Sequence, residues 1–203
     1  QADNTIIIYA ADHGLAMGSH GLLGKQNLYE HSMKAPVVIA GPGVPAGSDD
    51  ALVYLHDLFP TVLEYANSEV PADCEGRSLR PLFEGAALPE FRPTLFTTYK
   101  DPIRAIRDER WKLIRYPQID RTQLFDLVSD PDEINDLSES SDPAHQANKA
   151  RLLDQLLKAQ QEAGDTQPLA VANPQPAAID LTGHPRKPDQ WQPKWIVEKY
   201  FGK

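Results

Sequence analysis

Three features are scarce in this sequence, and each shortage excludes a class of protein. Cys74 is the single cysteine among 203 residues, so no internal disulfide can form. No apolar run reaches the roughly 18 residues that a transmembrane helix requires, so we expect no membrane partner. Lys and Arg number 20 against 29 Asp and Glu, giving a net charge of −9. Nonspecific nucleic-acid binding requires clustered cations, so no nucleic-acid partner is expected either.

The chain begins at Gln1 and has no basic-then-apolar leader. Because Gln1 is not a start methionine, the natural N-terminus could be absent, and a leader with it. The sequence alone therefore does not assign a compartment.

The first part of the chain predicts an α/β fold. Residues 5–11 and 36–40 are short, nearly continuous apolar runs, typical of strands buried on both faces of a parallel sheet. Apolar residues at helical spacing predict a helix over 55–66, with Pro60 in its first turn, where it is tolerated. We therefore expect residues 1–88 to complete a larger, mostly parallel sheet.

The second part, residues 89–203, has a different pattern. Residues 94–99, 103–107, 110–116 and 123–127 read as short strands close in sequence, which predicts a small antiparallel sheet. Asp108-Glu109 predicts a hairpin turn between the second and third strands. Asp142 and Pro143 predict the start of a helix that ends at Gly164 and lays a leucine stripe on this sheet. The stripe is Leu152, Leu153, Leu156 and Leu157. A Pro-rich tail follows, and we expect its aromatic residues to anchor it: Trp191, Trp195, Tyr200 and Phe201.

Chemistry-bearing side chains are concentrated directly after the first predicted strand. Asp12 and His13 stand at its carboxyl end, where open α/β sheets bind ligands. The glycine-rich stretch that follows brings His20 and Lys25 into the same loop. A carboxylate suits a hard cation such as Ca²⁺ or Mg²⁺, and an ammonium suits an anionic ester.

Each of these residues also has a simpler interpretation. An Asp-His pair after a strand is more often a turn or a helix cap than a metal site. A single lysine on a loop is usually just solvated, and His20 alone is as well explained by structure as by catalysis. Their concentration in one glycine-rich loop favours a functional site.

The same stretch resembles a conserved block of the type I sulfatases, which belong to the alkaline phosphatase superfamily. The resemblance rests on Asp12-His13-Gly14, residues 18–21, Gly24-Lys25, Tyr29-Glu30 and Ala35-Pro36. It continues in three later blocks, which occur in the order of the family: residues 56–61, residues 76–82 and residues 124–137. The match spans roughly residues 4–160.

The resemblance implies a role for each candidate residue. Asp12 and His13 would belong to a Ca²⁺ site (Mg²⁺ is possible), which polarises the sulfate and holds the nucleophile. Lys25 would bind the sulfate and stabilise charge on the leaving oxygen. His20 would have a supporting role in the pocket, whereas Tyr29 and Glu30 would orient the loop.

The resemblance also shows what this chain does not contain. The family's nucleophile is a formylglycine made in a Cys-x-Pro-x-Arg motif, and no such motif occurs here. Cys74 is followed by Arg77 but lacks the proline and the spacing, so we interpret it as a loop thiol without a catalytic role. We therefore expect this chain to need the N-terminal half of the same protein, which would carry the formylglycine.

Three functions stay open at this point. The leading one is a sulfatase acting on a sulfated carbohydrate or aryl sulfate, for which the family favours a periplasmic or secreted location. The second is a phosphodiesterase or phosphonate hydrolase of the same superfamily. The third is a non-catalytic remnant that binds sulfated glycans. Arg104, Arg107 and His184 could contact a glycan, although each is more simply a surface residue.

Overall fold

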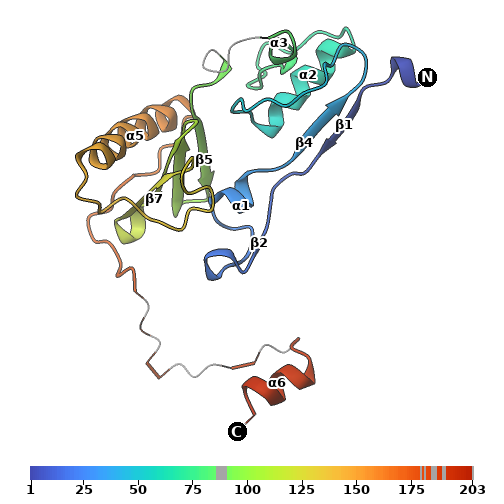
Figure 1. Ribbon diagram of the computed structural model, residues 1–203. Coiled ribbons are helices and arrows are strands. Elements are labelled where there is room, and N and C mark those ends of the chain that lie inside the picture. The colour runs from blue at the N-terminus through green and yellow to red at the C-terminus, as the bar shows by residue number, and fades with distance from the viewer. Residues whose placement is uncertain (86–90, 179, 181, 184–186, 189–190, 203) are drawn as a thin grey trace.

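The computed structural model contains two small sheets followed by a four-stranded sheet that carries a long helix (Figure 1). It describes residues 1–85, 91–178, 180, 182–183, 187–188 and 191–202. The expected boundary at residues 88 and 89, and His184, lie outside the described residues. Among the described residues, no helix combines the length and the hydrophobicity that a membrane span needs.

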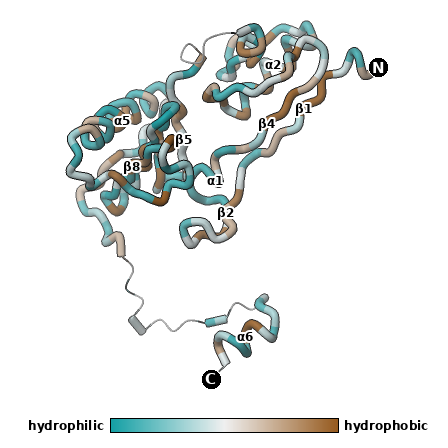
Figure 2. The backbone as a smooth tube through the Cα atoms, in the orientation of Figure 1, coloured by the Kyte–Doolittle hydropathy of each residue, from teal (hydrophilic) through white to brown (hydrophobic). Residues whose placement is uncertain are grey.

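The two apolar runs form β1 (Ile7–Ala10) and β4 (Val37–Ala40), which pair with each other. Their pairing is antiparallel, so the expectation of parallel strands is wrong for this pair. The strands are also not buried on both faces: Tyr9 is 65% exposed and Val38 is 60% exposed. Figure 2 shows the hydrophobic colour running along both strands. An apolar ribbon of two strands has too little surface to bury itself.

The helix expected over residues 55–66 is present as a 3₁₀ turn, Leu55–Asp57, followed by α2 (Leu58–Tyr65). Asp57 is fully buried at this junction and accepts hydrogen bonds from the main-chain N–H groups of Tyr54 and Arg77 at 2.7 and 2.8 Å. The guanidinium of Arg92 donates to both of its oxygens, at 2.7 and 2.9 Å. The short helix α3 (Arg80–Phe83) then follows. The blocks at 56–61 and 76–82 therefore meet around one buried carboxylate.

The four-stranded sheet is a meander, because each strand pairs with its neighbour in sequence. Hydrophobic side chains alternate between its two faces, as the period of two in a strand requires. Its strands are β5 (Leu95–Tyr99), β6 (Ile103–Arg107), β7 (Trp111–Tyr116) and β8 (Arg121–Asp126). Asp108 makes the predicted turn between β6 and β7 by accepting from the N–H groups of Arg110 and Trp111.

The long helix α5 (Pro143–Glu162) covers one face of this sheet (Figure 1). Its start is as predicted, since the Asp142 side chain accepts from the N–H of Ala144. Leu152 and Leu156 are fully buried against the sheet, whereas Leu157 at the edge of the expected stripe is exposed. The opposite face packs on Leu28 and Tyr29, so the loop region of the first half contributes to the core of the second.

The tail does not fold back in the way we expected. Trp191, Trp195 and Tyr200 are exposed, and helix α6 (Lys194–Tyr200) lies apart from the rest of the chain in Figure 1. Trp195 and Tyr200 therefore lie on the exposed surface of α6 and are not buried against the sheet in the described structure.

We expect the isolated 203 residues to unfold without a sharp two-state transition. The apolar faces of β1 and β4 lack cover, and exposed apolar strands promote association. Thermal unfolding followed by circular dichroism, together with binding of a hydrophobic dye, tests this expectation. A single cooperative transition with no dye binding would contradict it.

Replacing Asp57 with Asn should destabilise the complete protein by about 3–5 kcal/mol, because the buried Arg92 loses its counter-charge. Burial by itself would raise the pKa of Asp57, but the hydrogen bonds from Arg92 and two N–H groups outweigh it, so the pKa lies below 3.8. The unfolded state then binds this proton more readily, so the contribution is present above pH 3.8 and is lost as the pH falls. Urea unfolding at pH 7 and at acid pH measures both effects. Asp154→Asn, which disrupts an exposed pair with Lys158, is the matched control and should cost at most about 1 kcal/mol.

Candidate active site

A short hairpin brings Asp12, His13 and Lys25 together. After β1 the chain turns through Asp12 and His13 into β2 (Ala16–Met17), which pairs with β3 (Leu23–Gly24). Ala16 is opposite Gly24, so Lys25 returns to the end of the hairpin at which His13 lies. The tip of the hairpin is a tight turn in which Gly18 and Gly21 adopt positive φ angles of 112° and 70°.

The imidazole of His13 has a defined orientation. Its Nδ1 lies 2.7 Å from the carbonyl oxygen of Gly14, which can only accept, so Nδ1 carries the proton. In the neutral ring, Nε2 is then free to act as an acceptor or as a metal ligand. It lies 3.1 Å from Oδ2 of Asp12, and the ammonium of Lys25 donates to it. Nε2 of His13 and the carboxylate of Asp12 therefore lie close together, next to the ammonium of Lys25.

This arrangement is open and accessible: the side chain of Asp12 is 75% exposed and that of His13 is 33% exposed. The donor types fit a divalent cation, since one carboxylate oxygen and one oriented imidazole nitrogen point to the same place. Two donors are far fewer than the six to eight ligands that Ca²⁺ takes. Nowhere in the described ranges do three or more His, Cys, Asp or Glu side chains form a cluster that could hold a metal. The described residues alone therefore do not make a complete metal site.

His20 lies at the opposite end of the hairpin from His13 and Lys25. It adopts a left-handed conformation, with φ of 53°, and its ring stacks on Tyr29 at a centroid distance of 3.9 Å. Its Nε2 is 3.1 Å from the carbonyl oxygen of Asp132. The described contacts of His20 thus join the hairpin tip to a later loop and do not include Asp12 or Lys25.

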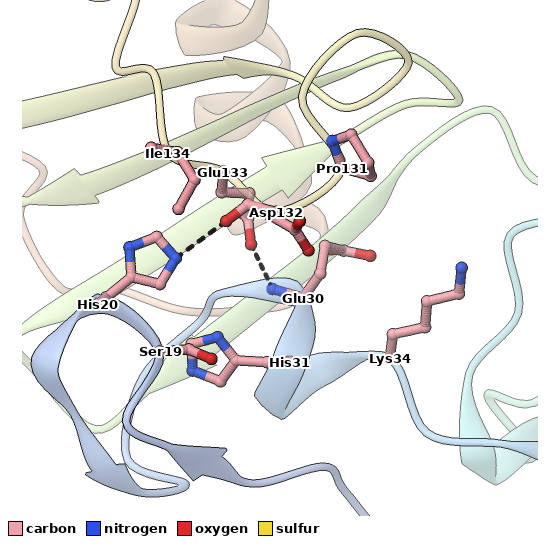
Figure 3. A pocket seen from close by; sticks show the side chains of 9 residues that line it. All are labelled: Ser19, His20, Glu30, His31, Lys34, Pro131, Asp132, Glu133 and Ile134. Carbon is pink, nitrogen blue, oxygen red and sulfur yellow. Dashed lines mark hydrogen bonds between the residues drawn. The ribbon is translucent and has the colours of Figure 1, made fainter.

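A cavity of about 550 Å³ opens beside this tip (Figure 3). His20 and His31 line it with ring centroids 5.5 Å apart, and residues 131–134 form the opposite wall. Nε2 of His31 is buried and has no hydrogen-bond partner among the described residues. Burial, followed by the nearby His20 and Lys112, lowers the pKa of His31. Sequence reasoning did not single out His31, because a lone histidine on a short helix carries no spacing signal.

The expected glycan contacts are also different in the structure. Arg104 is buried, and its guanidinium donates to Asp165 at 2.9 and 3.2 Å, so it is neither a glycan contact nor a surface residue. Arg107 is partly buried and donates to Glu30 at 2.6 Å. The thiol of Cys74 makes its described hydrogen bond to the carbonyl of Gly76.

The helix that follows the loop is held by a buried charge cluster that sequence reasoning missed. Glu30 begins α1 (Glu30–Met33), and its carboxylate accepts from Arg107 and Lys112. Burial alone would raise the pKa of Glu30, but these two cations outweigh it and lower it. The sequence contained one signal for this cluster. Arg107 and Lys112 flank the Asp108 turn, and the hairpin register places them opposite each other.

Comparison with known proteins places this site in a family context. The family described as "N-sulphoglucosamine sulphohydrolase, C-terminal" matches residues 18–162. An N-acetylglucosamine-6-O-sulfatase from Bacteroides thetaiotaomicron is 34% identical over 175 residues, covering 80% of this chain and 31% of that protein. A choline-sulfatase from Rhizobium meliloti is 36% identical over 145 residues, covering 68% of this chain and 28% of that protein. The chain thus spans about a third of the length of the curated relatives it matches.

Two solved structures also resemble this chain over most of its length. BT4656, solved in complex with its substrate D-glucosamine-2-N,6-O-disulfate, matches with a TM-score of 0.70 and 27% identity over 82% of this chain and 36% of that chain. The phosphonate monoester hydrolase SpPMH from Silicibacter pomeroyi matches with a TM-score of 0.66 and 29% identity, over 81% of this chain and 36% of that chain.

Gly14 is a position where the site tolerates no side chain. Its N–H donates to the carbonyl of Ser32 at 2.8 Å, and a Cβ added there would lie 2.0 Å from the carbonyl oxygen of His31. Gly14→Ala should therefore destabilise the complete protein by about 3 kcal/mol or more and displace the His13 turn. Gly18→Ala is the control, because its positive φ is strained but its surroundings are open, and it should cost about 1 kcal/mol. Equal urea midpoints for the two variants would show that the close contact between Gly14 and α1 does not contribute to stability.

Proposed function

The chain belongs to the sulfatase family of the alkaline phosphatase superfamily, and we propose that it forms the C-terminal part of a sulfuric ester hydrolase. The observation that carries this proposal is the grouping of Asp12, His13 and Lys25 at one end of the β2–β3 hairpin. A carboxylate and an oriented imidazole can hold a divalent cation, and an ammonium group beside them can bind an anionic ester. The strand pair β1–β4 would then be the edge of the larger, mostly parallel sheet of the complete enzyme.

In the proposed mechanism, the residues of this chain bind and polarise the substrate. Asp12 and Nε2 of His13 would hold part of a Ca²⁺ site, with Mg²⁺ as the alternative ion. The hydrogen bond from Nδ1 to Gly14 orients Nε2, and Lys25, which donates to Nε2 in this structure, would release it to bind the sulfate. Bound Ca²⁺ would act as a Lewis acid and a template. The ammonium of Lys25 would bind a sulfate oxygen and stabilise the charge that develops on the leaving oxygen. The formylglycine nucleophile would come from the preceding part of the protein, and His20 would support the loop from the hairpin tip.

The substrate class we propose is a sulfated carbohydrate or aryl sulfate. Curated relatives are named for N-acetylglucosamine-6-O-sulfate, choline sulfate and aryl sulfate hydrolysis, and a related structure holds a sulfated glucosamine. A periplasmic or secreted location agrees with this substrate class.

The second candidate function is phosphonate or phosphodiester hydrolysis. It is favoured by one observation: SpPMH matches this chain as well as several sulfatases do. A divalent cation beside an ammonium group can bind a phosphonate ester as well as a sulfate ester. A non-catalytic protein that binds sulfated glycans is the third candidate, and measured turnover by the complete protein would exclude it.

In the complete protein, Lys25→Ala should reduce kcat/KM for an aryl sulfate by about 10²–10³-fold, because the leaving oxygen loses a charged partner. Lys158→Ala, on the exposed face of α5, is the matched control and should leave kcat/KM unchanged. The measurement is the initial rate with an aryl sulfate and with an aryl phosphonate, with and without a calcium chelator. The isolated 203 residues should show negligible turnover. Full activity of Lys25→Ala, or a clear preference for the phosphonate, would contradict the proposal.

A further inference from the structure

The sheet places two cations opposite each other on the face that packs against α1. Arg107 on β6 and Lys112 on β7 are direct cross-strand partners, and both point to the side occupied by Leu28 and Tyr29. Like charges in this position destabilise a sheet unless an anion separates them. The carboxylate of Glu30 lies between them, with Oε2 2.6 Å from Arg107 and Oε1 2.9 Å from Lys112.

A second carboxylate completes the cluster. Glu133 lies 2.8 Å from the ammonium of Lys112 and accepts the main-chain N–H of Glu30 at 2.5 Å (Figure 3). The Lys112 side chain is 2% exposed and that of Glu133 is 1% exposed. The cluster therefore pairs two carboxyl groups with two cations, and this pairing opposes the burial that raises the pKa of Glu133, which is the condition under which buried charge is tolerated.

The cluster holds α1 by both its main chain and its side chain. This helix has only four residues, too few to be stable through its own hydrogen bonds, so its position depends on these contacts. It is in direct contact with the site, because the N–H of Gly14 donates to Ser32 and Gly14 packs on the His31 carbonyl. A continuous set of contacts therefore leads from Lys112 through Glu30 and α1 to the turn that carries Asp12 and His13.

We propose that Glu30, Arg107, Lys112 and Glu133 form a positioning centre that sets the Asp12–His13 turn relative to the rest of the active site. This inference rests on the proposed function and deepens it, since none of the four residues needs to touch substrate. It assigns a role to the buried charges beyond stability. A sheet of this kind could be stabilised equally well by apolar side chains.

The test separates positioning from stability with a charge-balanced double variant of the complete protein. Lys112→Met alone leaves the two carboxylates with one cation, so it should destabilise the fold. Lys112→Met with Glu133→Gln restores the balance, with Glu30 still paired to Arg107, so stability should largely recover. Activity should not recover with it: we expect kcat per folded molecule to stay about 10²-fold reduced, because a shift of about 1 Å in a site group has that effect. KM for the aryl sulfate should change less than about threefold, since substrate contacts outside the turn are kept.

A second readout does not depend on hydrolysis. The increase in Tm on adding Ca²⁺ reports how well Asp12 and His13 are placed, and it should be smaller in the double variant than in the wild type. If the wild type binds Ca²⁺ but does not hydrolyse sulfate esters, the proposed function fails while the positioning role is still tested. Glu133→Gln, which keeps the Lys112–Glu30 pair, is the milder variant if the double variant does not fold, and it should show the same changes in part.

The matched control removes another buried ion pair of the same sheet. Arg104→Met with Asp165→Asn deletes a bidentate pair on β6 that does not contact α1 in the described structure. It should lower stability without changing kcat per folded molecule or the Ca²⁺-induced rise in Tm. Recovery of kcat together with stability in the Lys112–Glu133 double variant would overturn the proposal.

Discussion

The carboxylate of Glu30, inserted between two cations on adjacent strands, joins the loop that carries the candidate site to the C-terminal sheet. Arg107 and Lys112 face each other across two strands on a largely buried face of the sheet, and Glu30 offsets their repulsion, with Glu133 as a second partner of Lys112. The sheet therefore requires a partner with a negative charge, and the loop region after Lys25 supplies it. The hydrogen bond between Tyr29 and Gln123 at 2.9 Å and the packing of Leu28 act in the same place. The loop that carries the candidate site is thus part of the core of the C-terminal sheet.

The geometry of the site follows from a hairpin of minimal length. Two paired residues on each strand are enough to return Lys25 to His13, and glycines in left-handed conformations close the turn between them. Sequence proximity alone would leave three solvated side chains with no fixed relation. The register of β2 and β3 brings the carboxylate of Asp12, the imidazole nitrogen of His13 and the ammonium of Lys25 together at one end of the hairpin.

Local signals in the sequence predicted much of the fold. The four strands of the meander, the Asp108 turn and the capped start of α5 all depend on alternation or on residues close in sequence. The direction of β4 relative to β1 was predicted wrongly, because two apolar runs carry no information about strand polarity. The exposure of these strands was also not predicted, because their apolar composition is typical of strands that pack against other parts of a protein.

The site could be predicted only in part. Asp12, His13 and Lys25 were predicted to lie together because they cluster in sequence, and the structure brings them into contact, whereas the Glu30–Lys112–Glu133 cluster joins residues up to 103 positions apart. Arg104 and Arg107 looked like surface cations because composition does not reveal a distant counter-charge. Their partners, Asp165 and Glu30, become apparent only from the packing of α5 and α1 on the sheet.

The meander has a consequence for the order of folding. Its strands pair only with their sequence neighbours, so each step closes a short loop at a small entropic cost. The contact between Glu30 and Lys112 closes a loop of 82 residues and needs the finished sheet as its template. We therefore expect the sheet and its helix to form early and the turn that carries Asp12 and His13 to be fixed late, so that the chain passes through a compact precursor in which this turn has no fixed position.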